Sequence, residues 1–119
     1  MFNGQLFRVK RLLKACGYSW HGLTFAWRNE TAFQQEIFAF LVMLPLAFWW
    51  PETRLESAIL VMSLFAVLIT ELINTAVEAA INRHGGEQHH WSGVAKDVAS
   101  AAVLLALIQC ALVWLLVLF

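Results

Sequence analysis

Charged side chains are scarce in this chain. They make up 13% of its 119 residues, and acidic and basic residues balance to a net charge of zero. A soluble domain of this size carries about 25% charged and about 45–50% apolar residues, whereas 61% of this sequence is hydrophobic. Because a small globule leaves much of its chain facing solvent, this composition indicates that the solvent is mostly lipid. We therefore exclude a soluble enzyme, a disordered chain and a nucleic-acid-binding protein.

Cysteine is also rare, and histidine forms no familiar pattern. Cys16 lies in a basic segment and Cys110 in an apolar run, which favours two small buried side chains over a disulfide or a metal pair. His84, His89 and His90 accompany Glu87, but their spacing matches no common zinc site. We interpret them as residues of a loop at the membrane surface.

Three long apolar segments occupy residues 31–50, 57–81 and 98–119, and Pro45 interrupts the first. As helices rising about 1.5 Å per residue, all three are long enough to cross a hydrocarbon core of about 30 Å. Basic residues crowd the region before the first segment and also occur in the 82–97 interval. The positive-inside rule therefore predicts a cytoplasmic N-terminus and a cytoplasmic 82–97 loop.

Residues 5–29 have a different pattern. Apolar side chains such as Leu12, Cys16 and Trp20 recur at steps of three or four, while Arg8 and Arg11 fall on another face. This pattern predicts an amphipathic helix on the membrane surface, or one packed on the bundle, with interruptions at its glycines. The sequence thus predicts a single-domain, all-α membrane protein with three transmembrane helices and an N-terminal amphipathic surface helix, assembled as an oligomeric helix bundle.

Polar residues break the apolar pattern at one depth. Glu71, Asn74, Thr75 and Glu78 share one helical face in the cytoplasmic half of the second segment. Other polar side chains reach the same depth from the first and third segments: Glu30, Lys96, Asp97 and Ser100. Ionisable groups inside a membrane are costly, so their default interpretation is functional.

Three interpretations of this cluster compete. It is a helix-packing network, the site of a small proton- or cation-coupled transporter, or the site of an enzyme at the membrane interface. In the enzyme, two carboxylates hold magnesium, a more buried carboxylate takes a proton from a hydroxyl, and a lysine balances phosphate charge. The polar cluster lies only in the cytoplasmic half of the predicted spans. This position favours the enzyme, because the site of a transporter needs access from both faces of the membrane.

Three sequence blocks carry a family resemblance: KACGYSWHGLTFAWRNETAFQQE, ELINTAVEAAINR and SGVAKDVASAAVL. In this order they closely resemble the signature blocks of the bacterial integral-membrane diacylglycerol kinases, a family that also contains undecaprenol kinases. The resemblance covers roughly residues 8 to 110. It implies an inner-membrane homotrimer with active sites shared between neighbours, which phosphorylates diacylglycerol to phosphatidate with ATP and magnesium.

The resemblance also implies roles for individual residues. Glu71 matches the catalytic base, Glu30 and Glu78 match the carboxylates that hold the metal of the nucleotide, and Asn74 matches a polar residue packed into the site. The positions that match nucleotide contacts are Arg11, Tyr18, Glu30, Glu78, Glu87, Gln88, His89, Lys96 and Asp97. The positions that match the lipid site are Arg11, Ala15, Cys16, Gly17, Tyr18, Ser19, Trp20, Ala32, Phe33, Gln34, Gln35, Glu36, Trp49, Glu71 and Ser100.

Four positions depart from the family pattern. Better-known members have arginine where this chain has Thr24 and Gln34, commonly aspartate at Asn82, and an acidic residue at His90. Thr24 and Gln34 bear on surface-helix contacts and lipid selection rather than on the chemistry. Asn82 lies one turn beyond Glu78 and lacks the carboxylate of its relatives. This difference could weaken magnesium binding or remove a salt bridge, and we favour the removal of a salt bridge.

Overall fold

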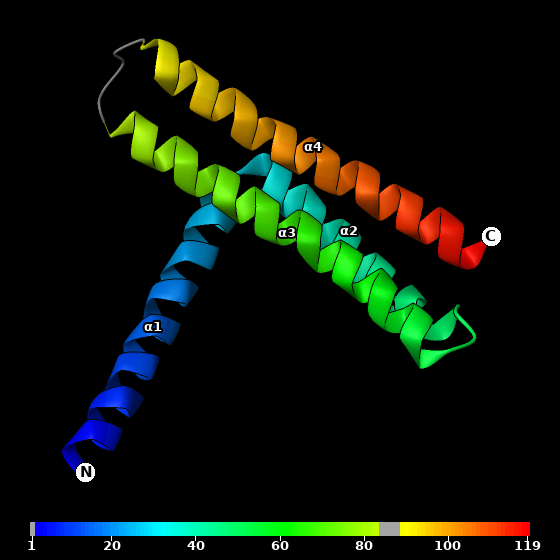
Figure 1. Ribbon diagram of the computed structural model, residues 1–119, viewed down its shortest axis with the longest axis horizontal. Coiled ribbons are helices and arrows are strands. Elements are labelled where there is room, and N and C mark those ends of the chain that lie inside the picture. The colour runs from blue at the N-terminus through cyan, green and yellow to red at the C-terminus, as the bar shows by residue number, and fades with distance from the viewer. Residues whose placement is uncertain (1, 84–88) are drawn as a thin grey trace.

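The computed structural model describes residues 2–83 and 89–119, and these residues form four helices. In chain order they are α1 (Phe2–Asn29), α2 (Thr31–Trp49), α3 (Arg54–Asn82) and α4 (His90–Leu118). The last three lie side by side, and α1 leaves one end of this bundle at a steep angle (Figure 1). The prediction of an all-helical chain is confirmed.

Local signals fix where the helices begin. Glu30 is the one extended residue between α1 and α2, with φ −117° and ψ 107°, and it turns the chain from one helix into the next. At the start of α3 the Thr53 hydroxyl accepts a hydrogen bond of 3.2 Å from the backbone N–H of Glu56. His89 acts in the same way for α4, since its Nδ1 accepts from the N–H of Trp91 at 3.2 Å. Such caps satisfy amides that have no partner inside the helix.

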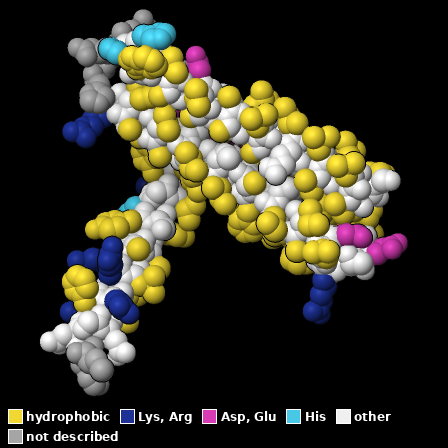
Figure 2. Space-filling model, in the orientation of Figure 1, with side chains coloured by type: hydrophobic (Ala, Val, Ile, Leu, Met, Phe, Trp, Pro, Cys, Tyr) yellow, Lys and Arg dark blue, Asp and Glu magenta, His cyan; other side chains and the backbone are white. Residues whose placement is uncertain are grey.

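Three helices, α2, α3 and α4, are long and apolar enough to cross a membrane. The 19 residues of α2 alone extend about 28 Å, close to the thickness of a hydrocarbon core. The most apolar windows of α2 and α4 are only 11% buried within the chain. Their remaining faces are therefore available to lipid or to other chains, and the space-filling view shows apolar side chains over the bundle surface (Figure 2).

The helices extend further than the apolar segments suggested. The fourth helix begins at His90, so the predicted 82–97 loop is wrong over its second half. Helix α1 runs through both Gly17 and Gly22, and α2 runs through Pro45. Hydropathy indicates which residues favour a lipid environment, so it gives the bounds of the apolar segments. The helices extend past these bounds, because backbone N–H and C=O groups form hydrogen bonds in polar turns as well. A single glycine costs only about 1 kcal/mol in a helix, which neighbouring turns can offset.

Two apolar clusters hold the helices together. Ala47, Leu60, Leu64 and Trp114 join α2, α3 and α4 in the half of the bundle that lies away from α1. A second cluster, Ala26, Phe33 and Leu68, fastens the end of α1 to α2 and α3. Because this second cluster lies beside Glu30, it sets the position of that residue against α3.

Candidate active site

Four glutamates meet in pairs where α1, α2 and α3 join. Glu71 on α3 is only 4% exposed, and its carboxyl lies within hydrogen-bonding reach of the Glu36 carboxyl on α2. Seven residues further along α3, Glu78 is within the same reach of Glu30. The spacing of seven places Glu71 and Glu78 on the same helical face, two turns apart. The predicted face of α3 is buried here, because Asn74 and Thr75 between them are buried as well.

The surroundings of Glu30 disfavour its charged form. Burial raises the pKa of Glu30 above its ordinary value, and the negative charges of Glu78 and Glu71 and a hydrogen bond with Glu78 raise it further. Two carboxylates held together in this way favour a cation between or beside them, and Mg²⁺ prefers such oxygen ligands. Within residues 2–83 and 89–119 no larger group of three acidic, histidine or cysteine side chains has the arrangement of a metal site.

Two acceptor atoms in this site have no partner. Asn74 donates from Nδ2 to Glu78 Oε1 at 3.4 Å, but its Oδ1 is buried without a hydrogen bond in the described part of the chain. The same holds for Oε2 of Glu36. Buried polar atoms are nearly always satisfied in native proteins. These two atoms are therefore exceptions within the described part of the chain, and both belong to the region of the paired glutamates.

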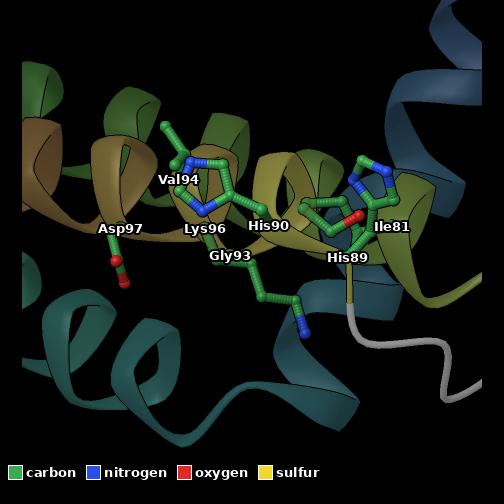
Figure 3. Close-up of a pocket in the computed structure, with 8 residues that line it drawn as sticks. Ile81, His89, His90, Gly93, Val94, Lys96 and Asp97 are labelled. Carbon is green, nitrogen blue, oxygen red and sulfur yellow. The ribbon is translucent and has the colours of Figure 1, made fainter.

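A polar hollow of about 600 Å³ lies at the start of α4, where Ile81 of α3 faces His89, His90, Lys96 and Asp97 (Figure 3). Lys96 and Asp97 extend from α4 separately from the two imidazole rings. The ammonium of Lys96 donates to Asn82 Oδ1 at 3.2 Å, and this hydrogen bond connects α4 to the end of α3. Asn82 follows Glu78 by one turn, so Lys96 of the hollow lies near the pair of Glu78 and Glu30.

An apolar hollow of about 460 Å³ opens between α1 and α3. Ser19 of the predicted lipid site lines it from α1, with Gly22 beside it, and Thr75 lines it from α3. Thr75 is four residues from Glu71, to whose backbone carbonyl its hydroxyl donates at 3.0 Å. The hollow therefore reaches the neighbourhood of the most buried carboxylate from the lipid side.

Several predicted site residues lie apart from the carboxylates in this chain. Arg11 and Tyr18 are exposed on α1. Trp49 lies at the opposite end of α2, and Phe33 is 2% exposed within the helix-joining cluster. The other α1 positions and three positions on α2 and α4 are exposed: Ala15, Cys16, Gly17, Ser19, Trp20, Ala32, Gln35 and Ser100. Gln34 is half-buried and donates to the carbonyl of Trp27. Glu87 and Gln88 lie outside the described residues.

Sequence reasoning missed two features of the site. The pairing of Glu36 with Glu71 joins different helices, and no spacing within one segment could indicate it. Asn82 was considered only as a lost carboxylate, although its amide holds Lys96. One feature of the sequence indicates where Asn82 lies, namely that it follows Glu78 by four residues and so shares its helical face.

Together these features define a class: a helical, multi-pass membrane protein with paired carboxylates and a polar hollow at one end of its bundle. The family model described as prokaryotic diacylglycerol kinase matches residues 17–118. The chain therefore belongs to the prokaryotic diacylglycerol kinase family.

Individual relatives agree over nearly full length. The chain is 44% identical to the diacylglycerol kinase of Escherichia coli K12 over 109 residues, which cover 92% of this chain and 89% of the relative. It is 42% identical to that of Haemophilus influenzae over 106 residues, or 89% and 90% of the two chains. It is 40% identical to that of Pseudomonas aeruginosa over 113 residues, or 95% and 91%.

Proposed function

We propose that this protein transfers the γ-phosphoryl group of ATP to the primary hydroxyl of diacylglycerol, forming phosphatidate and ADP. The reaction takes place at the cytoplasmic side of a bacterial inner membrane, where the N-terminus also lies. The observation that carries the proposal is the pairing of the buried Glu71 with Glu36, with an apolar hollow one turn away at Thr75 and a polar hollow at the start of α4. Relatives over nearly the whole chain bear the same activity in their names.

Glu71 is the proposed general base. It is the most buried of the four glutamates, and the apolar hollow brings a lipid hydroxyl to its turn of α3. Glu71 takes the proton of that hydroxyl as the oxygen forms a bond to the γ-phosphorus. The bond from that phosphorus to the bridging oxygen of ATP breaks, and ADP leaves. Phosphoryl transfer depends mainly on positioning and charge neutralisation, so this small set of side chains is sufficient.

Glu30 and Glu78 are the residues that would hold magnesium. Their donor set fits it, because two carboxyl groups within hydrogen-bonding reach of each other offer the oxygen ligands that Mg²⁺ prefers. When bound, the ion neutralises charge on the phosphate oxygens. Lys96 faces the phosphates from the polar hollow, and Asp97 and His89 line the same hollow. Arg11 and Tyr18 complete the proposed nucleotide contacts.

The lipid reaches the site from within the bilayer. Its acyl chains lie along the apolar hollow between α1 and α3, which Ser19 and Gly22 line. Its headgroup end faces Glu36 and Glu71, and the unpaired Oε2 of Glu36 is positioned to accept a hydrogen bond from it. ATP enters from the opposite, aqueous side, so neither substrate has to cross the membrane.

We further propose a homotrimer with shared sites. Large apolar faces of α2 and α4 are uncovered in the single chain, and buried acceptors at Glu36 and Asn74 lack donors. Neighbouring chains would cover these apolar faces and would help to supply donors for the two buried acceptors.

Purified protein in mixed micelles, supplied with radiolabelled ATP, magnesium, diacylglycerol and undecaprenol, tests the function. Label is expected in phosphatidate. The Glu71→Gln variant is expected to lose this transfer by a factor of about 10² or more, the lower range for a lost general base. Glu52→Gln is the matched control, because Glu52 is exposed beyond the far end of α2.

The possible results separate the alternatives. Label only in undecaprenyl phosphate would retain the chemistry and change the lipid. Retained activity in a folded Glu71→Gln variant would contradict the assignment of the base. No label in either lipid from folded wild-type protein would contradict the kinase proposal itself.

A further inference from the structure

The contact between Lys96 and Asn82 joins a cation to a neutral acceptor. Lys96 Nζ donates to Asn82 Oδ1 at 3.2 Å, across from α4 to the last residue of α3. Both side chains are exposed, and Lys96 lines the polar hollow. An amide oxygen orients the ammonium by its dipole without cancelling its charge. A carboxylate in the same place would form an ion pair and neutralise it.

The position of this contact matters because of its neighbours. Glu78 lies one turn back along α3, and its carboxyl is within hydrogen-bonding reach of Glu30, which lies between α1 and α2. Paired carboxyl groups of this kind suit a metal ion. Nucleotide phosphates bound between that pair and the hollow need a positive side chain on their other side. Lys96 lies there, on the rim that His89, Asp97 and Ile81 continue.

We propose that Asn82 is a positioning residue that sets nucleotide affinity: its amide carbonyl fixes the Lys96 ammonium at the rim and leaves its full charge to the phosphates. This inference rests on the proposed kinase function. It concerns binding of the phosphates rather than the chemical step, so its effect falls on the KM for ATP and not on kcat.

Three substitutions at this position separate charge from hydrogen bonding. Asn82→Gln retains the amide and is expected to remain within about two-fold of the wild-type KM for ATP. Asn82→Ala loses the hydrogen bond but adds no charge, and is expected to raise KM about two- to three-fold. Asn82→Asp retains an acceptor but neutralises Lys96, and is expected to raise KM about five- to ten-fold, or about 1 to 1.4 kcal/mol of binding. In all three, kcat stays within about two-fold of wild type.

The order of the variants is the decisive readout. A purely structural hydrogen bond predicts that Asn82→Asp is better than Asn82→Ala, because aspartate can still accept from Lys96. The proposal predicts the reverse. It also predicts that the KM ratio between Asn82→Asp and wild type shrinks between about 50 and 500 mM salt, because exposed charges are screened. In a Lys96→Gln background the Asn82→Asp change should no longer affect KM.

Gln5→Glu is the matched control, since it makes the same amide-to-carboxylate change at an exposed position near the start of α1. The melting temperature in detergent and the elution volume identify folded variants. Binding of MgATP is also measured by equilibrium dialysis, without turnover. A wild-type KM in Asn82→Asp, or a larger rise in Asn82→Ala than in Asn82→Asp, overturns this inference while wild-type transfer upholds the kinase. Wild-type protein that neither transfers phosphate nor binds MgATP overturns both.

Discussion

Glu30 is a residue whose protonation should be visible in the stability of the protein. Burial and the nearby charges of Glu78 and Glu71 raise its pKa, so the folded chain holds this proton more tightly than the unfolded chain does. The contribution of Glu30 to stability is therefore complete below about pH 4.5 and is lost as the pH rises through the raised pKa. In EDTA, we expect the melting temperature in detergent to fall over this window, and to fall less in Glu30→Gln.

Magnesium should reverse this loss in the wild type, because a bound cation favours the charged carboxylates. In activity assays, Glu30→Gln and Glu78→Gln should each raise the half-saturating magnesium concentration about ten-fold or more, which corresponds to about 1.4 kcal/mol of lost binding. Glu52→Gln should follow the wild type in both experiments. Unchanged magnesium titrations in both site variants would show that other residues hold the metal.

The sequence predicted which residues belong to the candidate site more accurately than which side chains contact one another there. The spacing of Glu71, Asn74 and Thr75 predicted one shared face of α3, and all three are buried. The carboxyl pairing of Glu36 with Glu71 depends on how α2 packs against α3, which no local pattern contains. The resemblance placed Glu36 only among lipid contacts.

Between α3 and α4, one buried hydrogen bond carries a measurable part of the packing. Trp114 on α4 is 8% exposed, and its Nε1 donates to Ser63 Oγ on α3 at 3.1 Å. Ser63→Ala leaves this indole N–H buried without its partner. Hydrogen bonds between membrane helices contribute about 0.6 kcal/mol on average and up to about 1.7. We expect a coupling energy in this range from a double-mutant cycle of Ser63→Ala and Trp114→Phe.

Unfolding in mixed micelles with increasing SDS measures this coupling. Thr70→Ala is the control, because the Thr70 hydroxyl donates only to carbonyls of its own helix, at 3.0 and 2.9 Å. Its combination with Trp114→Phe should be additive. Additive behaviour of the Ser63 pair would mean that apolar packing alone joins the two helices here.

Helix existence followed from hydropathy, but helix ends did not. The start of α4 at His90 depends on a cap from His89 Nδ1 to the Trp91 N–H. This cap has no apolar signature, and the polar first turns of α4 resemble a loop in composition. Helix α1 likewise continues through Gly17, because the helix propensity of the neighbouring residues offsets the cost of a single glycine.

The arrangement of the whole chain separates two parts of the proposed nucleotide site. Ala26 is where α1 packs on α2 and α3, and Arg11 lies nearer the N-terminal end of α1, which extends away from the bundle (Figure 1). Ala26 follows Arg11 by fifteen positions, or about 22 Å along the helix, too far for Arg11 to reach Glu78 of its own chain. If Arg11 contacts the nucleotide, it does so at a neighbour's site.

Mixed oligomers test this arrangement. Chains with Glu71→Gln and chains with Arg11→Ala should each be nearly inactive alone. Co-expressed in equal amounts, they should recover about a quarter of wild-type turnover, because a site needs Glu71 from one kind of chain and Arg11 from the other, each present half the time. Phosphate transfer by the co-purified mixture, with a different affinity tag on each chain, measures this recovery.

The control mixture of Glu71→Gln with Glu36→Gln should recover almost nothing, since those two side chains meet within one chain. No recovery in the mixture of Glu71→Gln with Arg11→Ala would place Arg11 at the site of its own chain. Recovery in the control mixture would contradict the pairing of Glu36 with Glu71 within one chain.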